Sequence, residues 1–440
     1  MNYQDEYKKK KRTLFDAYEI LCNRDVIACG CCGNEPVAFL KNLSSQKDTL
    51  SQLSLLLSLS LGEYDFLDDA TLLDFITVYS WFLMGPTRRA YNAGFLEYVP
   101  GHLHNCSDRQ NQVNRATVFV TSVTPMDRHG YFRYSLCNIA ENMWLKNADR
   151  VILEVNPNMP ITYGDNEVHI SQVDCVYEVD IPIPILKQGE LGDSDKAIGE
   201  YVASLVDDGD TIQLGIGSIP DAVAQAFMSK RDLGVHTEMI TNSIVDLVEA
   251  GVINGRKKSL HDRKIVGVFA LGSQRLYDFL HHNPSVLIMP GSYVNDPYVV
   301  SRNDNMVSIN TSLGVDFCGQ VSSEAIGSVQ YSGTGGQNDT AEGSIHARNG
   351  RSIIAMKSTV KNGTISAIQS TLNPGSIVTL SRNNVDYIVT EYGIANLKSK
   401  SIQERTKALI SIAHPKFRDQ LTEEAIKLRF LRRPVFNGVQ

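Results

Sequence analysis

A glycine-rich turn and a carboxylate about twenty residues downstream could together carry group-transfer chemistry near the middle of the chain. The turn is Gly215-Ile-Gly-Ser-Ile-Pro220, and the apolar run from Thr211 to Leu214 precedes it. Glycines let a ligand approach the backbone, and the free N–H groups at a helix start favour a phosphate or another anion. The fixed φ of Pro220 suits the first turn of a helix. The stretch is typical of an anion-binding strand–turn–helix unit, and a purely structural turn is the alternative.

The spacing of this turn differs from the dinucleotide-binding fingerprint. In G-x-G-x-x-G the third glycine allows close packing of helix on strand, whereas Pro220 stands at that place here. No convincing ribose-binding acid follows. The pattern therefore disfavours an NAD-dependent oxidoreductase.

Three carboxylates are candidates for a nucleophile or base. Glu238 lies in His236-Thr-Glu-Met-Ile, an apolar and β-branched setting that predicts a strand end. Glu324 follows Val-Ser-Ser, and Glu154 ends the run Val-Ile-Leu-Glu. The residue types and spacing alone do not separate the three.

A second glycine loop and a lysine could serve the same ligand. Gly333-Thr-Gly-Gly336 offers backbone donors, and Lys357 ends an apolar strand where it could meet a phosphate. The residues alone favour a solvated strand end for Lys357. Cys29, Cys31 and Cys32, with His102 and His104, are weak candidates for metal ligands, because no second pair stands at a zinc-finger spacing.

Composition excludes several classes of function. The 440 residues are 42% hydrophobic and 21% charged, and the net charge is −7. This balance is typical of a globular protein and disfavours nucleic-acid binding. No apolar stretch approaches a membrane span, and no secretory signal is present. Eight cysteines without regular spacing fit a reducing compartment, so we expect a cytoplasmic protein.

Strands and helices alternate along the chain, which predicts an α/β fold with a mostly parallel sheet. A helix is expected over 6–21. Asp25 precedes Gly30 by the same five residues that separate Asp210 from Gly215, and a proline and an apolar helix follow each turn. This repeat suggests two related halves. We place the boundary near residue 188, giving domains 1–188 and 189–440.

Many short motifs resemble the acetyl-CoA hydrolase/transferase family, the family I CoA-transferases, and most strongly its 4-hydroxybutyrate CoA-transferase branch. The resemblance covers about 20–430. The motifs include Gly215-Ile-Gly-Ser-Ile-Pro, His236-Thr-Glu-Met, Tyr293-Val-Asn-Asp-Pro, Gly319-Gln-Val-Ser-Ser-Glu, Ser332-Gly-Thr-Gly-Gly-Gln and Val385-Asp-Tyr-Ile-Val-Thr-Glu-Tyr-Gly.

The resemblance implies two related open α/β domains of the CoA-transferase type, with the acyl or carboxylate side on the N-terminal domain. It also implies transfer of coenzyme A from an acyl-CoA to a free carboxylate, with Glu238 as nucleophile. An acyl-glutamyl anhydride and then a glutamyl-CoA thioester would form. Coenzyme A would be a substrate, with no permanently bound cofactor and no metal, and the protein would be a homo-oligomer. The implied CoA contacts are Gly215, Ile216, Gly217, Ser218, Ile219, Ile309, Gly333 and Lys357, and Gly335 and Gly336 would belong to the oxyanion-binding loop.

Two segments depart from the family pattern. Thr241-Asn-Ser follows the nucleophile where Ser-Asp-Gly is usual, and the turn Cys29-Gly-Cys-Cys-Gly is unusually rich in cysteine. The acceptor therefore stays open among acetate, butyrate, 4-hydroxybutyrate and a dicarboxylate such as itaconate. An acyl-CoA hydrolase on the same scaffold is the near alternative. A non-catalytic module that binds nucleotides or sugar phosphates is the more distant one.

Overall fold

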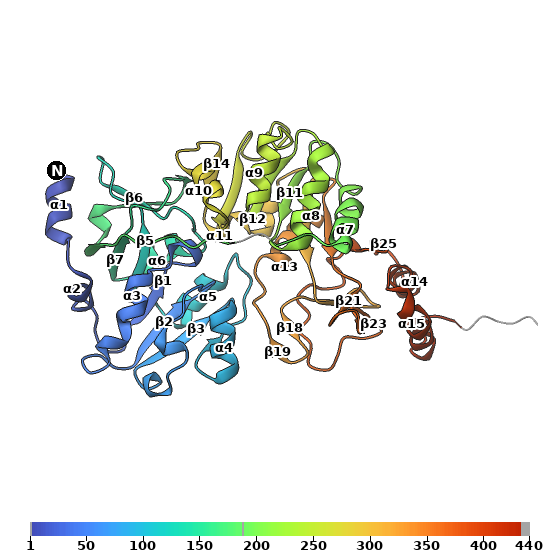
Figure 1. Ribbon diagram of the computed structural model, residues 1–440, viewed down its shortest axis with the longest axis horizontal. Helices are drawn as coiled ribbons and strands as arrows, with labels where there is room; N and C mark the ends of the chain where they lie inside the picture. Colours follow the sequence, from blue (N-terminus) through green and yellow to red (C-terminus); the bar gives the residue numbers. More distant parts are fainter. Residues whose placement is uncertain (1, 187–188, 433–440) are drawn as a thin grey trace, which may run out of the picture.

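Two parallel sheets, each flanked by helices, make up the computed structural model, which describes residues 2–186 and 189–432. In Figure 1 the N-terminal sheet lies in the blue and green half, and the C-terminal sheet lies in the yellow-green to red half. The predicted boundary near residue 188 lies outside the described residues. The predicted α/β class with two related open domains is confirmed.

The first sheet has the strand order β10-β7-β5-β1-β2-β3-β4, and every neighbouring pair is parallel. Short apolar runs such as Val26-Ile-Ala-Cys are buried on both faces, as expected for parallel strands covered by helices. The strands are β1 (Val26–Cys29), β2 (Leu53–Leu57), β3 (Ile76–Ser80), β4 (Glu97–Tyr98), β5 (Val118–Val123), β7 (Arg150–Val155) and β10 (Cys175–Glu178).

The second sheet has the order β25-β24-β20-β15-β11-β12-β13-β14-β8, and only the edge pair β24–β25 is antiparallel. Its strands are β11 (Thr211–Leu214), β12 (Gly234–Ile240), β13 (Ile265–Ala270), β14 (Val286–Ile288), β15 (Met306–Thr311), β20 (Arg351–Ala355), β24 (Tyr387–Thr390), β25 (Gly393–Asn396) and β8 (Tyr163–Gly164). β8 comes from the N-terminal part of the chain, so the first 188 residues also supply an edge strand to the second sheet.

The helices follow the strands closely. In the first half they include α3 (Val37–Asn42), α4 (Gly85–Ala93), α5 (Cys106–Val113) and α6 (Glu141–Asn147). In the second half they include α7 (Asp193–Ala203), α8 (Ser218–Ala226), α9 (Asn242–Glu249), α10 (Gln274–Leu280), α11 (Gly291–Val294), α12 (Pro297–Val300), α13 (Gln337–His346), α14 (Ile402–Ser411) and α15 (Pro415–Lys427). Figure 1 shows α14 and α15 at the outer end of the C-terminal half.

The same ion pair occurs at the same place in both sheets, which supports the predicted internal repeat. Asp25 pairs with Arg150 across β1 and β7, and Asp210 pairs with Arg351 across β11 and β20. Each aspartate also accepts a hydrogen bond from the backbone N–H three residues before it. Strand order agrees, since β1 lies between β5 and β2 as β11 lies between β15 and β12.

The predicted helix over 6–21 is wrong as one element. The chain forms α1 (Tyr3–Lys10) and α2 (Leu14–Tyr18), with an extended Lys11 between them. Lys11 forms a parallel bridge with Val176 of β10, and Thr13 begins the second helix with a capping box to Asp16. Pairing with the sheet edge overrides the helical periodicity of this segment.

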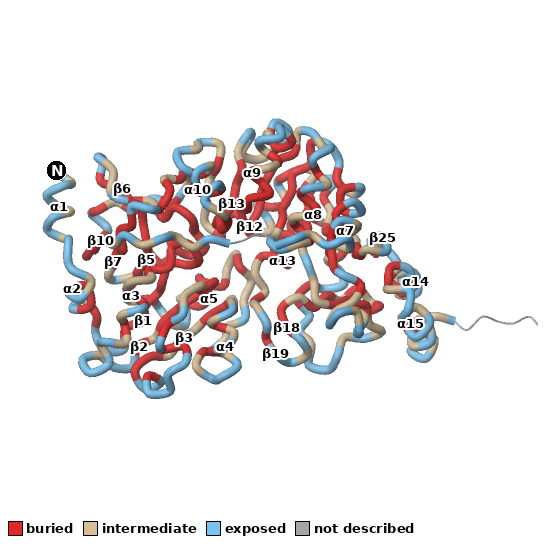
Figure 2. Tube along the Cα trace, in the orientation of Figure 1, coloured by how far each residue is buried: buried red, intermediate tan, exposed pale blue. Residues whose placement is uncertain are grey.

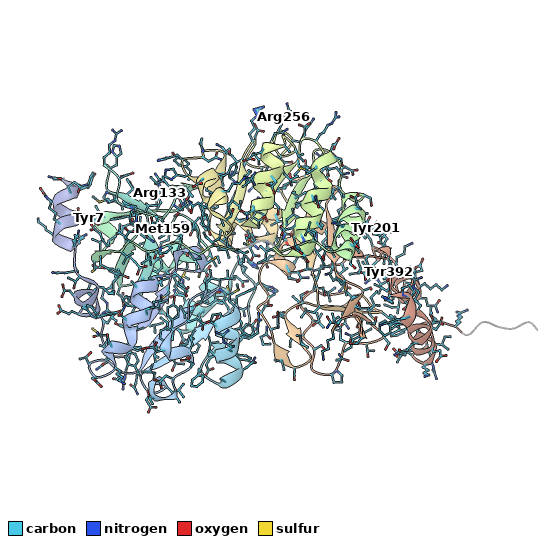
Figure 3. The ribbon with its side chains drawn as sticks, in the orientation of Figure 1. Tyr7, Arg133, Met159, Tyr201, Arg256 and Tyr392 are labelled. Carbon is cyan, nitrogen blue, oxygen red and sulfur yellow. The ribbon has the colours of Figure 1, made fainter. Side chains whose placement is uncertain are left out.

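Buried apolar residues join the two halves. One cluster combines Trp81 and Trp144 of the first half with Val266 and Phe269 of β13. Figure 2 shows the strands of both sheets mostly buried, with the outer faces of α1, α14 and α15 exposed. In Figure 3, Tyr7 lies toward one end of the long axis, and Tyr392 lies in the other half, inward of the C-terminal helices. Within the described ranges, no helix combines the length and apolarity of a membrane span.

Candidate active site

A cavity of about 230 Å³ opens between the two halves, at the carboxyl ends of β11, β12 and β15. Its lining includes Leu59 and Phe82 from the first half and Gly215, Glu238 and Gly336 from the second. Strand order reverses at β11, because the chain runs outward from β11 through β12 and β13 to β14 and then returns to β15 on the other side of β11. Ligands of open α/β sheets bind at such a switch point. The fold therefore brings Glu238 and both predicted glycine loops to one site.

Glu238 is held by β12 in a setting that disfavours its charge. Burial raises the pKa of Glu238 to about 7, and the nearby carboxylate of Asp339 adds to the increase. The N–H of Gly336 and the side chain of Asn295 act in the opposite direction. Only part of the side chain is accessible, on the cavity side. A poorly solvated carboxylate of this kind is suited to attack an electrophile that enters the cavity.

His236, two residues before Glu238, has a structural role. Its Nε2 donates to the carbonyl oxygen of Val294 at 2.8 Å, and the ring is completely buried. Burial lowers the pKa of His236 to about 3, so the ring is neutral at physiological pH. Residues i and i+2 share a face of a strand. The His236 bond therefore anchors the Val294–Asn295 segment beside Glu238.

Asn295 is the strongest functional candidate that the sequence did not assign. It is completely buried, yet neither amide atom has a regular hydrogen-bond partner among the described residues. Its amide lies close enough to Glu238 to favour the ionised carboxylate. Buried polar groups are normally satisfied, so an amide without a regular partner beside Glu238 is a candidate to donate to a reacting group. The signal was the motif Tyr293-Val-Asn-Asp-Pro, which had no assigned role.

The second glycine loop approaches Glu238 very closely. A Cβ on Gly336 would overlap both Glu238 Oε2 and Asn295 Nδ2. A Cβ on Gly333 would overlap the backbone of Trp81 and Phe82 in the first half. Gly335 has φ of +56°, where a side chain would be strained. The loop therefore needs glycine to place backbone donors against the carboxylate.

The first half holds this loop in place. Leu103 donates its N–H to Gly335 O at 3.2 Å, and Thr334 Oγ1 contacts Glu324 Oε2 at 3.2 Å. Glu324 Oε2 also accepts from Tyr98 at 3.2 Å. Glu324, one of the three candidate carboxylates, thus supports the loop and does not line the cavity.

Asp339 and His104 form a second contact between the halves. Asp339 is completely buried in the first turn of α13, and its carboxylate accepts from the backbone N–H of His104 at 3.1 Å. The His104 ring contacts the same carboxylate at 2.8 Å. This hydrogen bond raises the pKa of His104. The predicted metal alternative gains no support, since no cluster of three or more ligating side chains occurs among the described residues.

The first glycine turn and Lys357 meet beside α8. Gly217 has φ of +113°, which only glycine adopts readily. Asp195 on α7 accepts from Ser218 Oγ at 3.0 Å, and its carboxylate lies 3.1 Å from Lys357 Nζ. The lysine side chain is about half exposed, with 47% of its surface accessible. An ammonium group at the start of a helix, next to a glycine turn, suits a phosphate.

The two repeated glycine turns differ in one decisive residue. At the start of α3, Glu154 accepts from the backbone N–H groups of Ala38 and Phe39, and from Ser122 and Tyr177. The register of the two sheets places Ala355 where the first half has Glu154. The first turn is thus filled by an internal carboxylate, which also excludes Glu154 as the nucleophile. The second turn is not filled from that position.

The other residues predicted to contact CoA or the oxyanion fall into two groups, those that line the cavity and those that are buried. Gly215, Ile216, Gly333, Gly335 and Gly336 line the cavity with Glu238. Ile219 is largely buried on α8, and Ile309 is buried in the core. The neighbour of Ile309, Asn310, lines the cavity instead.

The two segments that depart from the family pattern lie in different places. Cys32 lines the cavity, whereas Asn242 accepts from Ser273 at 3.0 and 2.9 Å beneath it. Ser243 bonds Asp221. Among the described residues, the Thr241-Asn-Ser segment contributes no side chain to the cavity lining. Of these two segments, only the cysteine-rich turn lines the cavity.

Comparisons with known proteins agree with this geometry. Residues 1–187 match the acetyl-CoA hydrolase/transferase N-terminal domain, and residues 272–425 match the acetyl-CoA hydrolase/transferase C-terminal domain. The 4-hydroxybutyrate coenzyme A transferase of Clostridium kluyveri is 41% identical over 98% of this chain and 100% of its own. The succinyl-CoA:cyclohexane-1-carboxylate CoA transferase of Geobacter metallireducens is 39% identical, over 97% of each chain.

Solved structures agree as well. The crystal structure of RipA from Yersinia pestis superposes with a TM-score of 0.93 at 33% identity, over 98% of this chain and 100% of that one. The chain therefore belongs to the acetyl-CoA hydrolase/transferase family, and it is an enzyme of the acyl-CoA:carboxylate CoA-transferase class. The predicted family and class are confirmed.

Proposed function

We propose that the protein moves coenzyme A from acetyl-CoA, or another short acyl-CoA, to a short-chain carboxylate through a covalent intermediate on Glu238. The proposal rests on one observation above all. The Glu238 carboxylate faces a cavity that Gly215 and Ile216 border, and the Gly336 N–H and the buried Asn295 amide lie beside that carboxylate.

The route needs no net proton transfer. A Glu238 oxygen attacks the thioester carbonyl, the C–S bond breaks, and an acyl-glutamyl anhydride and CoA thiolate form. The thiolate attacks the glutamyl carbonyl, releases the acyl group as a carboxylate and leaves a glutamyl-CoA thioester. A second carboxylate reverses both steps. Anions exchange places throughout, so no acid or base beyond Glu238 is required.

Stabilisation of the oxyanion is the main task of the surrounding residues. Negative charge develops on the carbonyl oxygen in each addition step. The Gly336 N–H and the Asn295 amide can donate to it from fixed positions in a poorly solvated site, where such donors are most effective. The close approach of Gly336 fixes the donor before substrate arrives, so little reorganisation is needed.

Coenzyme A is proposed to lie along the first glycine turn. Its phosphates would meet Lys357 and the start of α8, and its pantetheine would pass Ile216, which is 44% exposed at the cavity. Binding of this remote part can be used to hold the thioester against Glu238. Ile309 contributes as core beneath the site.

The proposed acceptor is a short-chain carboxylate such as 4-hydroxybutyrate, as the name of the Clostridium relative suggests, or its unsubstituted parent butyrate. Hydrolysis of acyl-CoA is the second candidate. Apolar side chains line one wall of the cavity and disfavour water as the attacking group. A homo-oligomeric state and a cytoplasmic location stay predictions.

The test is the dependence of thioester loss on acceptor. Acetyl-CoA is incubated with the enzyme, with and without butyrate, and both thioesters are followed by chromatography. Transfer predicts that acetyl-CoA falls and butyryl-CoA rises in equal amounts, only when butyrate is present. Loss of acetyl-CoA at the same rate without butyrate would make the protein a hydrolase.

A further inference from the structure

The cavity has two walls of different chemistry. One wall carries backbone and polar groups, including Gly215, Asn310 and the glycine loop from Gly333 to Gly336. The other wall is apolar, combines both halves of the molecule and packs against the glycine loop through Phe82. Its larger side chains are Leu59, Leu61, Phe82, Met84, Phe269 and Leu271.

Charge in the cavity is entirely negative. Glu238 is the one charged side chain among the described residues that line it, and the buried Asp339 acts on it from behind. None of the described groups that shift the pKa of Glu238 is a cation. When the acceptor acid arrives, Glu238 is a neutral thioester with CoA, so a second carboxylate in this space would still meet the like charge of Asp339.

Basic groups near the cavity have partners elsewhere. Arg88 donates to Tyr331 O, and its guanidinium lies 3.6 Å from the Tyr331 ring centroid. His104 is bound to Asp339, and Lys357 pairs with Asp195 at the far side of the glycine turn. A dicarboxylate therefore finds no cation on the apolar wall.

Building on the proposed function, we infer that the acyl site selects monocarboxylates with an uncharged chain and rejects dicarboxylates. The reacting carboxylate faces Glu238 and the donors of Gly336 and Asn295, while the chain lies along the apolar wall. The name of the Geobacter relative includes succinyl-CoA, so acyl choice differs within the family. The apolar wall determines that choice in this chain.

Two energetic effects favour butyrate-like acids over dicarboxylates. Burial of methylene groups on the apolar wall increases affinity, by roughly fourfold for each added group. A buried and unpaired carboxylate loses its hydration without compensation, and like charges repel it further. We expect at least about 100-fold discrimination between acids that differ only in a terminal methyl or carboxylate.

Butyrate and succinate make the matched pair, because a carboxylate in succinate replaces the terminal methyl of butyrate. Acetyl-CoA serves as donor, and kcat/KM is measured for each acid from the acyl-CoA product. We expect succinate to be at least about 100-fold poorer than butyrate. Propionate should be roughly fourfold poorer than butyrate. Succinate within tenfold of butyrate would overturn the inference.

A variant tests the wall itself. Met84 is partly exposed on the apolar wall, and lysine has a similar length and unbranched shape. Met84→Lys should raise the ratio of succinate to butyrate kcat/KM by at least about tenfold, since the new cation can pair with the second carboxylate. Met84→Leu is the control and should keep the native ratio. An unchanged ratio in a folded Met84→Lys enzyme would contradict the role of the wall.

Different results would overturn the monocarboxylate preference and the proposed CoA transfer. Equal transfer to succinate and butyrate would overturn the monocarboxylate preference and leave CoA transfer intact. Steady acetyl-CoA hydrolysis with no acyl-CoA product from any acid would overturn the proposed function, and the acceptor preference would fall with it.

Discussion

The completely buried carboxylate of Asp339 raises the pKa of Glu238, although the two residues lie on different elements, α13 and β12. Burial makes the larger contribution to this shift. Asp339 is itself bound by the backbone and ring of His104 from the first half. Packing of the two halves thus affects both the position of the glycine loop and the charge around Glu238.

The pH dependence of the first half-reaction follows from the raised pKa. Only the ionised Glu238 can attack, and its pKa is about 7. The rate constant for acylation should therefore rise through about pH 7 and fall roughly tenfold per unit below pH 6. Rapid-quench measurement of acetate released from acetyl-CoA between pH 5 and 9 checks this. A rate that is flat down to pH 5 would mean that Glu238 ionises normally.

Removing the charge of Asp339 should shift that dependence. Asp339→Asn keeps one acceptor oxygen for His104 but removes a like charge, so the pKa of Glu238 falls and the acid limb moves down by roughly half to one pH unit. Glu342→Gln on the same helix is the matched control, with no expected shift. If Asp339 has only a structural role, Asp339→Asn should lower activity but leave the midpoint of the acid limb at its native pH.

Loss of the Asn295 amide should slow chemistry more than binding. Asn295→Ala removes a proposed donor to the developing oxyanion, so kcat should fall by about 10² to 10³. The dissociation constant for CoA, measured by calorimetry, should change little. Asn283→Ala, in a turn before β14, is the control and should keep kcat. Equal kcat in Asn295→Ala and native enzyme would exclude Asn295 as an oxyanion donor.

The opposite pattern is expected at Lys357. Lys357→Ala should raise KM for acetyl-CoA by about tenfold and leave kcat nearly unchanged, because the lysine would bind a phosphate remote from the thioester. Lys361 is an exposed lysine a little further along the chain, and Lys361→Ala should change neither KM nor kcat. Steady-state kinetics with varied acetyl-CoA distinguish an effect on KM from an effect on kcat. A fall in kcat at unchanged KM would place Lys357 closer to the chemistry.

Local pattern was enough to predict much of this fold. The buried run Thr211–Leu214 became a strand with the predicted bounds, and the repeat of Asp25 and Asp210 reflects a true structural repeat. Gly217 and Gly335 could be interpreted as turn residues, because both adopt a positive φ that few residues other than glycine tolerate. The helix over 6–21 failed because Lys11 pairs with a strand far away in sequence.

The site itself was harder to predict. Glu238 could not be separated from Glu154 and Glu324 by residue type, since their partners come from distant segments such as Ala38 and Tyr98. Asn295 and Asp339 were missed for the same reason. Their roles arise only when α11, α13 and the loop before α5 pack around β12. The resemblance to a family supplied Glu238, and the fold supplied its surroundings.

The most direct test is the intact mass of the enzyme after incubation with acetyl-CoA alone. Covalent transfer predicts an adduct of CoA minus one water on the native chain, mapped by peptide sequencing to Glu238. Added butyrate should discharge it with release of butyryl-CoA. Glu238→Gln should carry no adduct. An adduct on another residue, or full turnover by Glu238→Gln, would contradict the account.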